Sequence, residues 1–509
     1  MSVVEPMNRP NVILITVDSL RPDHLGCYGY GKPTSPNLDA FARRCHVFER
    51  AWAAGPNTPT SFPALMASRM PFGTPSFGVL GAPLTLAEML RGAGYRTQGF
   101  NAGNPYVSRF FGYDRGFDQL ADFLDYEAGE HVAFRHMEPD AQVGARSDTL
   151  ADRLRRAILA GTERATRPFP GLQHVAGRLR RLWRTVGRAV RLPYSLQAKV
   201  RLERAFWSAV GRWVSEDRKE PFFLWVHAMT VHVPYAPPAR CQRAASGRAI
   251  SRARVGQLAR LVALANHGDL EGLGQQDVRD SAALYDAEVR HVDELLGRLF
   301  TGLRKRGRRR SVVIVTADHG EQFLEHGRLV HPSFHYNELL RVPLLIHLPG
   351  QSEGRRIARQ VGLVDLMPTL AEVLGIEPGG CGCVGRSFAS LLRGSSDAAA
   401  AERLYVAESF YGPNDTVDGV NWQRPCEAGR RVSFQNSRIK LAVDLTSGDC
   451  SVFDLRADPG EKSDLAARRP ELAQIAQRLA CLHVRQSERE RASRAVGRRP
   501  ELNSRRGGA

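Results

Sequence analysis

Residues Ser311 to Gly320 read SVVIVTADHG, and this stretch decides the fold that we expect. The run SVVIVT is a near-continuous series of β-branched residues, which is typical of a strand buried on both faces of a parallel sheet. It is followed by Asp318 and His319, a carboxylate and an imidazole. Because ligands of open α/β sheets bind beyond the carboxyl ends of strands, this stretch predicts a functional site as well as a central strand.

A second stretch near the N-terminus repeats the pattern. Residues Asn11 to Val17 read NVILITV and are followed by Asp18 and Ser19. Two buried strands that each end in an aspartate can place both carboxylates around one cation. Carboxylate oxygens are the ligands that hard divalent cations prefer. The two stretches together therefore predict a metal site at the ends of the strands.

Strand and helix patterns alternate along most of the chain. Further buried strands are expected at Pro221 to Val226 and Arg341 to Leu348, and helices near Pro36 and from Ser281 to Phe300. The segment from Gly55 to Pro71 is rich in Pro, Thr and Ser, and we expect a loop there. The alternation predicts an α/β fold with a large doubly wound, mostly parallel sheet and helices on both faces.

The C-terminal part of the chain has a different pattern. Short apolar runs separated by turns, at 431–434, 439–444 and 451–455, predict a small antiparallel sheet in an α+β domain. The last residues are rich in Arg, Glu and Gly without periodicity, which is typical of disorder. We expect three parts: a catalytic domain at 1–395, a small domain at 396–484 and a disordered basic tail at 485–509.

Residues 163–203 form a basic insertion in the predicted catalytic domain. Between Glu163 and Glu203 the chain has no acidic residue. Apolar residues, Trp183 among them, recur at helical spacing from Val175 to Val190, and arginines take the other faces. Such a helix can bind an anionic membrane surface or another polyanion. Packing on the domain with a solvated basic face is an equal alternative.

Composition limits the classes of protein to consider. The 509-residue chain is 43% hydrophobic and 24% charged, as globular proteins are. Its net charge of +18 suggests an acidic partner or substrate, but no nucleic-acid module is recognisable, so nucleic acid is not an expected partner. No run approaches the ~18 apolar residues of a membrane span, and no secretory apolar segment is visible. We expect a cytoplasmic protein, peripherally membrane-bound if the basic helix contacts lipid, with its scattered cysteines as free thiols.

Several ordered segments resemble the sulfatase family of the alkaline phosphatase superfamily. The resemblance runs from Asn11 to about Leu465, and the segments have the family's order and spacing. They read NVILITVDSLRPDHLGCYGY, PFFLWVHAMTVHVPYAPP, YDAEVRHVDELLG, VIVTADHGEQFLEHG, ELLRVPLLIHLPG, VDLMPTLAEVLGI and FDLRADPGEKSDL.

The resemblance implies one divalent cation beside a nucleophile that attacks sulfur or phosphorus. Carried over onto this chain, Asp18, Asp318 and His319 are expected metal ligands, with the nucleophile oxygen completing the set. His319 stands where many sulfatases have Asn, and Ser19 stands where many calcium-binding members have a second Asp. Fewer oxygen ligands and one nitrogen move the expectation from calcium towards manganese. Capping of the segment after a strand is the alternative role for the two aspartates.

The nucleophile segment departs most from the family pattern. Sulfatases carry Cys or Ser, then Pro two residues on and Arg four on, for oxidation to formylglycine. Here Thr58 takes the nucleophile position, Thr60 replaces the Pro and Phe62 replaces the Arg. We therefore expect no formylglycine. The pattern is similar instead to relatives that transfer phosphoryl headgroups through a covalent phosphothreonine. Thr60 and Ser61 are alternative nucleophiles, and a turn without catalytic function is another interpretation.

Histidines and one asparagine complete the predicted site. His227 and His232 lie in a segment whose family counterpart lines the oxyanion pocket, and His331 falls where relatives place a Lys or His beside the anion. We expect all three to be catalytic, and His227 and His331 also to bind substrate. Asn104 lies where the family often has a Lys that contacts the transferred group. His326 and His335 are weaker candidates.

The sequence thus predicts a metal-dependent hydrolase of sulfuric or phosphoric esters with a Thr nucleophile. One alternative is a phosphodiesterase or phosphoryl-headgroup transferase of the same superfamily. Another is a catalytically dead homologue that binds membranes or polyanions. The expected substrate is a small anionic ester or a lipid headgroup.

Overall fold

The computed structural model describes most of the chain outside one long segment. The described residues are 9–74, 78–79, 81–124, 196–216, 220–266, 270–305, 310–377, 382–394, 402–412, 415, 417, 420 and 428–496. The predicted basic helix from Val175 to Val190 and residues 395–401, at the start of the predicted small domain, lie outside the described residues.

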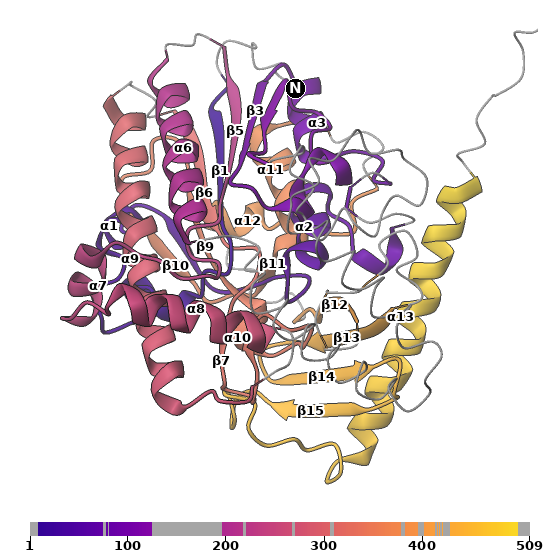
Figure 1. Ribbon diagram of the computed structural model, residues 1–509. Helices are drawn as coiled ribbons and strands as arrows, with labels where there is room; N and C mark the ends of the chain where they lie inside the picture. The colour runs from indigo at the N-terminus through magenta and orange to yellow at the C-terminus, as the bar shows by residue number, and fades with distance from the viewer. Residues whose placement is uncertain are drawn as a thin grey trace, which may run out of the picture. The chain divides into compact units, whose positions relative to one another are not determined.

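The centre of the main sheet consists of three parallel strands. Strand β1 (Asn11–Val17) lies between β5 (Phe222–Ala228) and β6 (Ser311–Thr316), and β6 is buried along its whole length (Figure 1). Thr16 pairs with Thr316 on one side and with His227 on the other. This register brings the carboxyl ends of β1, β5 and β6 to one edge of the sheet. The predicted central strand and its position are confirmed.

Among the described residues, the sheet has nine strands in the order β10-β2-β9-β6-β1-β5-β3-β4, with β11 beside β2. Strand β9 runs antiparallel to both of its neighbours, β6 and β2, and the other pairs are parallel. The sheet is therefore mostly parallel, as expected. The outer strands are β2 (His46–Trp52), β3 (Arg96–Asn101), β4 (Gln119–Ala121), β9 (Arg341–His347), β10 (Arg355–Ile357) and β11 (Val361–Gly362).

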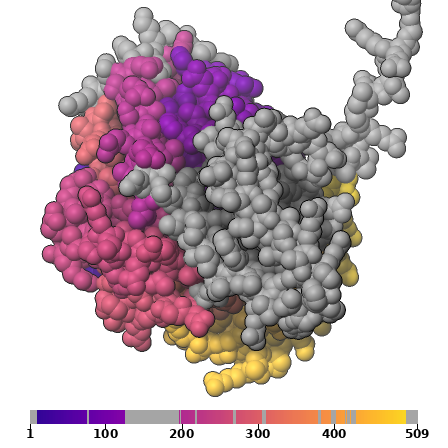
Figure 2. Space-filling model, in the orientation of Figure 1, coloured from indigo at the N-terminus to yellow at the C-terminus, as the bar shows by residue number. Residues whose placement is uncertain are grey.

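Helices cover both faces of this sheet, with α6 and α9 on one side and α2 and α3 on the other (Figure 1). The apolar stripe of α9 is buried at Leu284, Val289, Val292 and Leu296, as its spacing predicts. In the surface view, the magenta and pink segment containing α6 to α9 occupies the left of the described part (Figure 2). The helices of the main domain are α1 (Pro36–Ala42), α2 (Thr58–Ala67), α3 (Leu86–Gly92), α6 (Leu196–Ser215), α7 (Ala239–Ser246), α8 (Arg252–Asn266), α9 (Gln275–Lys305), α10 (Asn337–Leu340), α11 (Leu366–Leu374) and α12 (Ala389–Leu392).

The expected loop from Gly55 to Pro71 is wrong, because its centre forms helix α2. Pro59 lies in the first turn, where a missing N–H costs no hydrogen bond. Every residue from Thr58 to Ala67 is buried. A helix buried on all sides has no polar face, so it lacks the periodicity by which an amphipathic helix is found in a sequence.

The C-terminal part forms the predicted antiparallel sheet and one unpredicted helix. The sheet has the order β12-β13-β14-β15. Helix α13 (Pro470–Val496) packs against it and against the turn at Pro71–Gly73. The strands are β12 (Tyr405–Tyr411), β13 (Gly429–Gln435), β14 (Ile439–Asp444) and β15 (Cys450–Asp454).

The prediction of a disordered tail is wrong for residues 485–496, which continue α13. Ser487 is buried, and the Arg491 guanidinium donates a hydrogen bond to the Thr74 carbonyl oxygen at 3.2 Å. These tertiary contacts supply the stability that the polar composition alone does not indicate. Residues 497–509 lie outside the described part.

Two further expectations meet the structure here. No helix of the described residues is long and apolar enough to cross a membrane. Five of the described cysteines are free thiols, but Cys383 is disulfide-bonded, so the expectation of free thiols is wrong there. Spacing in the sequence does not show which sulfur atoms come within bonding distance.

Candidate active site

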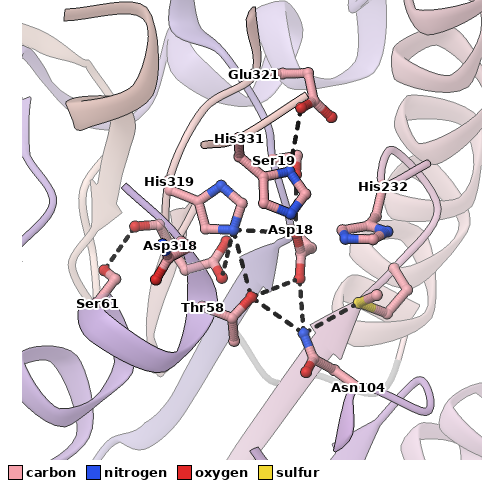
Figure 3. A network of polar contacts seen from close by, with 12 residues as sticks. Asp18, Ser19, Thr58, Ser61, Asn104, His232, Asp318, His319, Glu321 and His331 are labelled. Atoms are coloured by element: carbon pink, nitrogen blue, oxygen red, sulfur yellow. Dashed lines mark hydrogen bonds and ion pairs between the residues drawn. The ribbon is translucent and has the colours of Figure 1, made fainter. Parts of the chain in front are cut away.

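Two buried carboxylates and an imidazole form the centre of the site (Figure 3). Asp18 follows β1 and Asp318 follows β6, and neither is exposed to solvent. The His319 Nε2 atom lies 3.5 Å from Asp18 Oδ1 and 3.5 Å from Asp318 Oδ2. Ser19 adopts a left-handed backbone with φ of 61°, and its hydroxyl donates to Asp18 Oδ1 at 2.9 Å. The chain turns sharply after β1 and leaves the Asp18 carboxylate at the end of the strand.

The donor set fits a divalent cation. Both carboxylate oxygens of Asp318 are buried without a hydrogen-bond partner among the described residues. Burial and the nearby charge of Asp18 raise the pKa of Asp318. A buried carboxylate without a partner carries a large desolvation cost, which a cation between the two aspartates removes. Suitable donor atoms of Asp18, His227 and Asp318 lie within 4.8 Å of one another.

His227 lies closer to this metal centre than the sequence suggests. It is the sixth residue of β5, and its Nε2 atom is 3.4 Å from Asp18 Oδ2. Its Nδ1 atom lies 2.9 Å from the Thr16 hydroxyl, and its ring packs edge-on against Phe62. This placement makes His227 a further candidate metal ligand, because a ring held through Nδ1 presents Nε2 to the carboxylates.

Thr58 is the hydroxyl that faces the centre. It is the first residue of α2, and its Oγ1 atom lies 3.2 Å from Asp18 Oδ2 and 3.3 Å from His319 Nε2. The hydroxyl of Thr60 donates instead to Asn57 Oδ1 at 2.7 Å, and that of Ser61 donates to the Asp318 carbonyl oxygen at 2.6 Å. Of the three candidate nucleophiles, the structure brings Thr58 to the predicted ligands and points the other two elsewhere. The positive end of the α2 dipole favours negative charge on this oxygen.

Asn104 is held with its amide nitrogen towards the nucleophile position. The Nδ2 atom donates to Asp18 Oδ2 at 2.9 Å and to Thr58 Oγ1 at 3.2 Å (Figure 3). Its Oδ1 atom accepts a hydrogen bond from the Tyr106 backbone N–H at 3.0 Å, which fixes the orientation of the amide. Asn104 can therefore donate to an oxygen of a group bound to Thr58.

His232 and His331 lie beside this centre. Their rings are 5.0 Å apart, and the ring of His331 is 4.7 Å from that of His319. His232 Nδ1 donates to the Val233 carbonyl oxygen at 2.6 Å, so Nε2 stays available. Burial lowers the pKa of His232 to about 4, against the opposing effect of Asp18. The structure thus brings both predicted histidines next to the metal centre.

Glu321 is a buried residue beside the site that the sequence reasoning did not name. It is fully buried; its Oε1 atom lies 3.1 Å from His331 Nδ1, and its Oε2 atom accepts the Tyr235 hydroxyl at 3.1 Å. Burial raises the pKa of Glu321 to about 7. Val330, just before His331, has a φ of 68°, a strained conformation for a β-branched residue. The sequence feature that could have indicated this residue is the position of Glu321 directly after Asp318-His319-Gly320.

The weaker histidine candidates lie in other networks. His326 Nδ1 is 2.5 Å from Glu338, and His335 Nε2 is 2.9 Å from the Ser409 hydroxyl of β12. Both rings connect the main domain with residues of the C-terminal part. They have no part in the cluster around Asp18.

Comparisons with known proteins give similarities along most of the chain. The model of the Sulfatase family matches residues 10–376. Arylsulfatase K of Xenopus laevis is 32% identical over 203 residues, which are 39% of this chain and 36% of that protein, so the match spans about a third of this relative. Steryl-sulfatase of Mus musculus is 24% identical over 542 residues, covering 90% of this chain and 78% of that protein.

Solved structures share the fold. A phosphonate monoester hydrolase of Agrobacterium radiobacter has a TM-score of 0.64 at 20% identity, covering 94% of this chain and 96% of the other. A putative sulfatase from Bacteroides thetaiotaomicron has a TM-score of 0.62 at 18% identity, with 96% and 94% covered. At these identities the likeness shows the architecture, including the mostly parallel sheet and the small C-terminal sheet.

Proposed function

This chain belongs to the sulfatase family, and we propose that it is a metal-dependent hydrolase of sulfuric or phosphoric esters with Thr58 as nucleophile. One observation carries the proposal: Thr58 Oγ1 lies within 3.3 Å of both Asp18 and His319, at the N-terminus of a buried helix. A hydroxyl in this position is close to its proton acceptor and to the atoms that would bind a cation. The same placement argues against a catalytically dead homologue.

The metal would be held by Asp18, Asp318, His319 and His227. A cation bound there acts as a Lewis acid and lowers the pKa of a neighbouring hydroxyl. Two imidazoles beside two carboxylates favour manganese over calcium, which prefers an all-oxygen shell. The His319 Nδ1 atom lies 2.8 Å from the Gly320 carbonyl oxygen, which leaves its Nε2 lone pair for the metal.

The reaction would proceed in two steps through a covalent ester of Thr58. In the first, Thr58 gives up its proton towards Asp18 and its oxygen attacks the phosphorus or sulfur atom, while the bond to the leaving oxygen breaks. Asn104 donates a hydrogen bond that stabilises negative charge on the transferred group. The leaving oxygen takes a proton from protonated His331. In the second step a water attacks, His331 accepts its proton, the ester bond to Thr58 Oγ1 breaks, and Asp18 returns the proton that restores the Thr58 hydroxyl.

A threonine nucleophile favours phosphorus esters over sulfuric esters. Formylglycine, which the sulfatase motif provides, cannot form at Thr58, because it arises from Cys or Ser. An alkoxide that attacks phosphorus gives a phosphothreonine of the kind used by headgroup transferases. Transfer to an alcohol in place of water is therefore the second candidate function. A lipid headgroup as substrate and a membrane contact through Val175–Val190 remain predictions from the sequence.

The test is ester hydrolysis by the full chain with added Mn²⁺. Aryl sulfate, phosphate monoester, phosphodiester and phosphonate ester substrates are compared for wild type and Thr58→Ala. We expect turnover of a phosphorus ester, and a loss of kcat of roughly 10³-fold or more in the variant, as for removal of a covalent nucleophile.

Thr60→Ala and Ser61→Ala are the matched controls, since these hydroxyls lie on the same helix but point elsewhere. They should keep kcat within about tenfold of wild type if they fold. Full activity of Thr58→Ala would overturn the proposal. Loss of activity in Ser61→Ala alone would move the nucleophile to that residue.

A further inference from the structure

A second group of metal-ligating side chains lies outside the active site, between helices α7 and α9. Cys241 comes from α7, and His291 and Glu294 come from the neighbouring turns of α9. Their donor atoms all lie within 4.8 Å of one another. We propose that Cys241, His291 and Glu294 form an accessory zinc site that links α7 to α9, which pack side by side (Figure 1).

The spacing of the three donor atoms suits a tetrahedral ion. With Zn–N near 2.0 Å and Zn–S near 2.3 Å, ligand atoms around tetrahedral zinc are about 3.3–3.8 Å apart. The donor atoms lie within 4.8 Å of one another, and small side-chain rotations would bring them to the separations of a zinc site. Cys241 is a free, fully buried thiol, whereas His291 and Glu294 are partly exposed, so an ion can reach the cluster from solvent.

Two buried polar atoms beside the cluster lack partners among the described residues. His291 Nδ1 and Glu203 Oε1 have no hydrogen bond. The other atoms of the same groups are paired, because His291 Nε2 lies 3.4 Å from Glu203 Oε2. An unsatisfied buried polar atom costs about 1–3 kcal/mol. Metal binding through Nδ1 would remove one of these costs, while Glu203 holds the opposite side of the ring as carboxylates hold zinc-bound histidines.

One oxygen of Glu294 has no hydrogen bond and only a long ion pair. Glu294 Oε2 accepts a hydrogen bond from Arg240 at 2.8 Å, whereas Oε1 forms an ion pair with Arg290 Nε at 3.6 Å, which a metal ion would replace. A carboxylate oriented by one arginine can bind a metal through its other oxygen. A metal binds the deprotonated thiol and the neutral imidazole, so metal binding would release protons.

The ligand chemistry separates this site from the catalytic one. A thiolate with an imidazole and a carboxylate is a borderline-soft set that favours zinc, whereas the active site offers only oxygen and nitrogen atoms. A thiolate ligand also has a spectroscopic signature. Cobalt(II), which substitutes for zinc, gives a near-ultraviolet thiolate charge-transfer band that an oxygen and nitrogen site cannot produce.

The experiment titrates the full chain with Co²⁺ and with Zn²⁺ and compares wild type with Cys241→Ser. We expect the thiolate band in wild type and its loss in the variant, together with one zinc ion fewer per chain by atomic spectroscopy. Cys481→Ser, which removes an exposed free thiol, is the matched control and should keep the band. Mn²⁺-dependent hydrolysis should stay within about twofold in both variants, which separates this test from that of the active site.

A second variant guards against a folding defect in Cys241→Ser. His291→Gln keeps the thiol and should weaken zinc binding by at least about tenfold. Absence of the band in wild type, or its persistence in Cys241→Ser, would overturn the proposal and leave Cys241 as an apolar packing residue beside Ala245 and Ala287.

Discussion

Each histidine of the active site is held through Nδ1 and presents Nε2. The partners of Nδ1 are the Thr16 hydroxyl for His227, the Val233 carbonyl for His232, the Gly320 carbonyl for His319 and Glu321 for His331. The partner of the first nitrogen sets which atom can bind metal or move a proton. His331 differs from the others because its partner is a carboxylate, which stabilises the protonated ring and so favours it as the acid for the leaving group.

Glu321→Gln tests this role of Glu321 as a positioning residue. The substitution keeps the size of the side chain but removes the charge that orients and stabilises protonated His331. We expect a loss in kcat of roughly 10²-fold for esters of poor leaving groups such as alkyl alcohols, within the range of general acid catalysis. Nitrophenyl esters, which need little proton assistance, should lose less than about tenfold.

A uniform loss for both kinds of ester would contradict the acid role, because a merely structural defect does not depend on the leaving group. Tyr235→Phe is a milder companion, since it removes only the hydroxyl that donates to Glu321. It should give the same leaving-group dependence with a smaller amplitude.

At the scale of elements, helix α13 contacts both the C-terminal sheet and the main domain and so connects the two. His483 Nε2 of α13 lies 2.5 Å from the buried Glu408 of β12, and Glu408 also accepts the backbone N–H of Phe72. Burial alone would lower the pKa of His483, but the hydrogen bond and charge of Glu408 raise it above 6.5. The helix is thus attached through an ion pair that depends on protonation of His483.

The pH dependence of stability follows from the direction of this shift. A pKa raised in the folded state contributes stability that is complete below the unfolded value of 6.5 and is lost as pH rises through the folded value. We therefore expect the urea midpoint of wild type to fall between pH 6 and pH 9 relative to His483→Gln. Parallel curves for the two proteins over this range would contradict the assignment.

At the scale of the whole molecule, the proposed metal centre joins strands that come from distant parts of the chain. Asp18, His227 and Asp318 follow or end β1, β5 and β6, and without a cation the two carboxylates repel each other at the end of the sheet. Ligand binding to the folded state adds stability by mass action, about 2.7 kcal/mol at a concentration of 100 times Kd.

Removal of metal should therefore lower the melting temperature. We expect chelation to lower Tm by a few degrees and Mn²⁺ to restore it, measured by calorimetry. Asp318→Asn removes the repulsion and one anionic ligand, so its Tm should respond little to chelator or Mn²⁺. An unchanged wild-type Tm would contradict metal binding at this centre. Mn²⁺ is the probe because the thiolate cluster at Cys241 does not favour it.

The sequence by itself determined the central strands and the two aspartates at their ends. A buried parallel strand is a short run of β-branched and other apolar residues, which can be recognised from the local sequence alone. Ligands of such sheets bind at the carboxyl ends of the strands. The resemblance to the family also pointed to Thr58, Asn104, His232, His319 and His331, all of which the structure brings to one place. The strands β2 and β12 and the helix α13 were missed, because their stability comes from packing against residues far away in the chain.

Only the tertiary structure decided which hydroxyl faces the metal centre and which histidines do so. All three candidate nucleophiles are hydroxyl residues in the same short segment. The packing of the buried helix α2 sets its rotation about its own axis. This rotation directs Thr58 towards Asp18, 40 residues away, and His319, 261 residues away. The positions of His227 and Glu321 depend in the same way on strand register and on contacts across the sheet. Local sequence encodes the tendency to form a strand or helix, whereas the direction of a buried side chain results from packing between segments that the sequence separates.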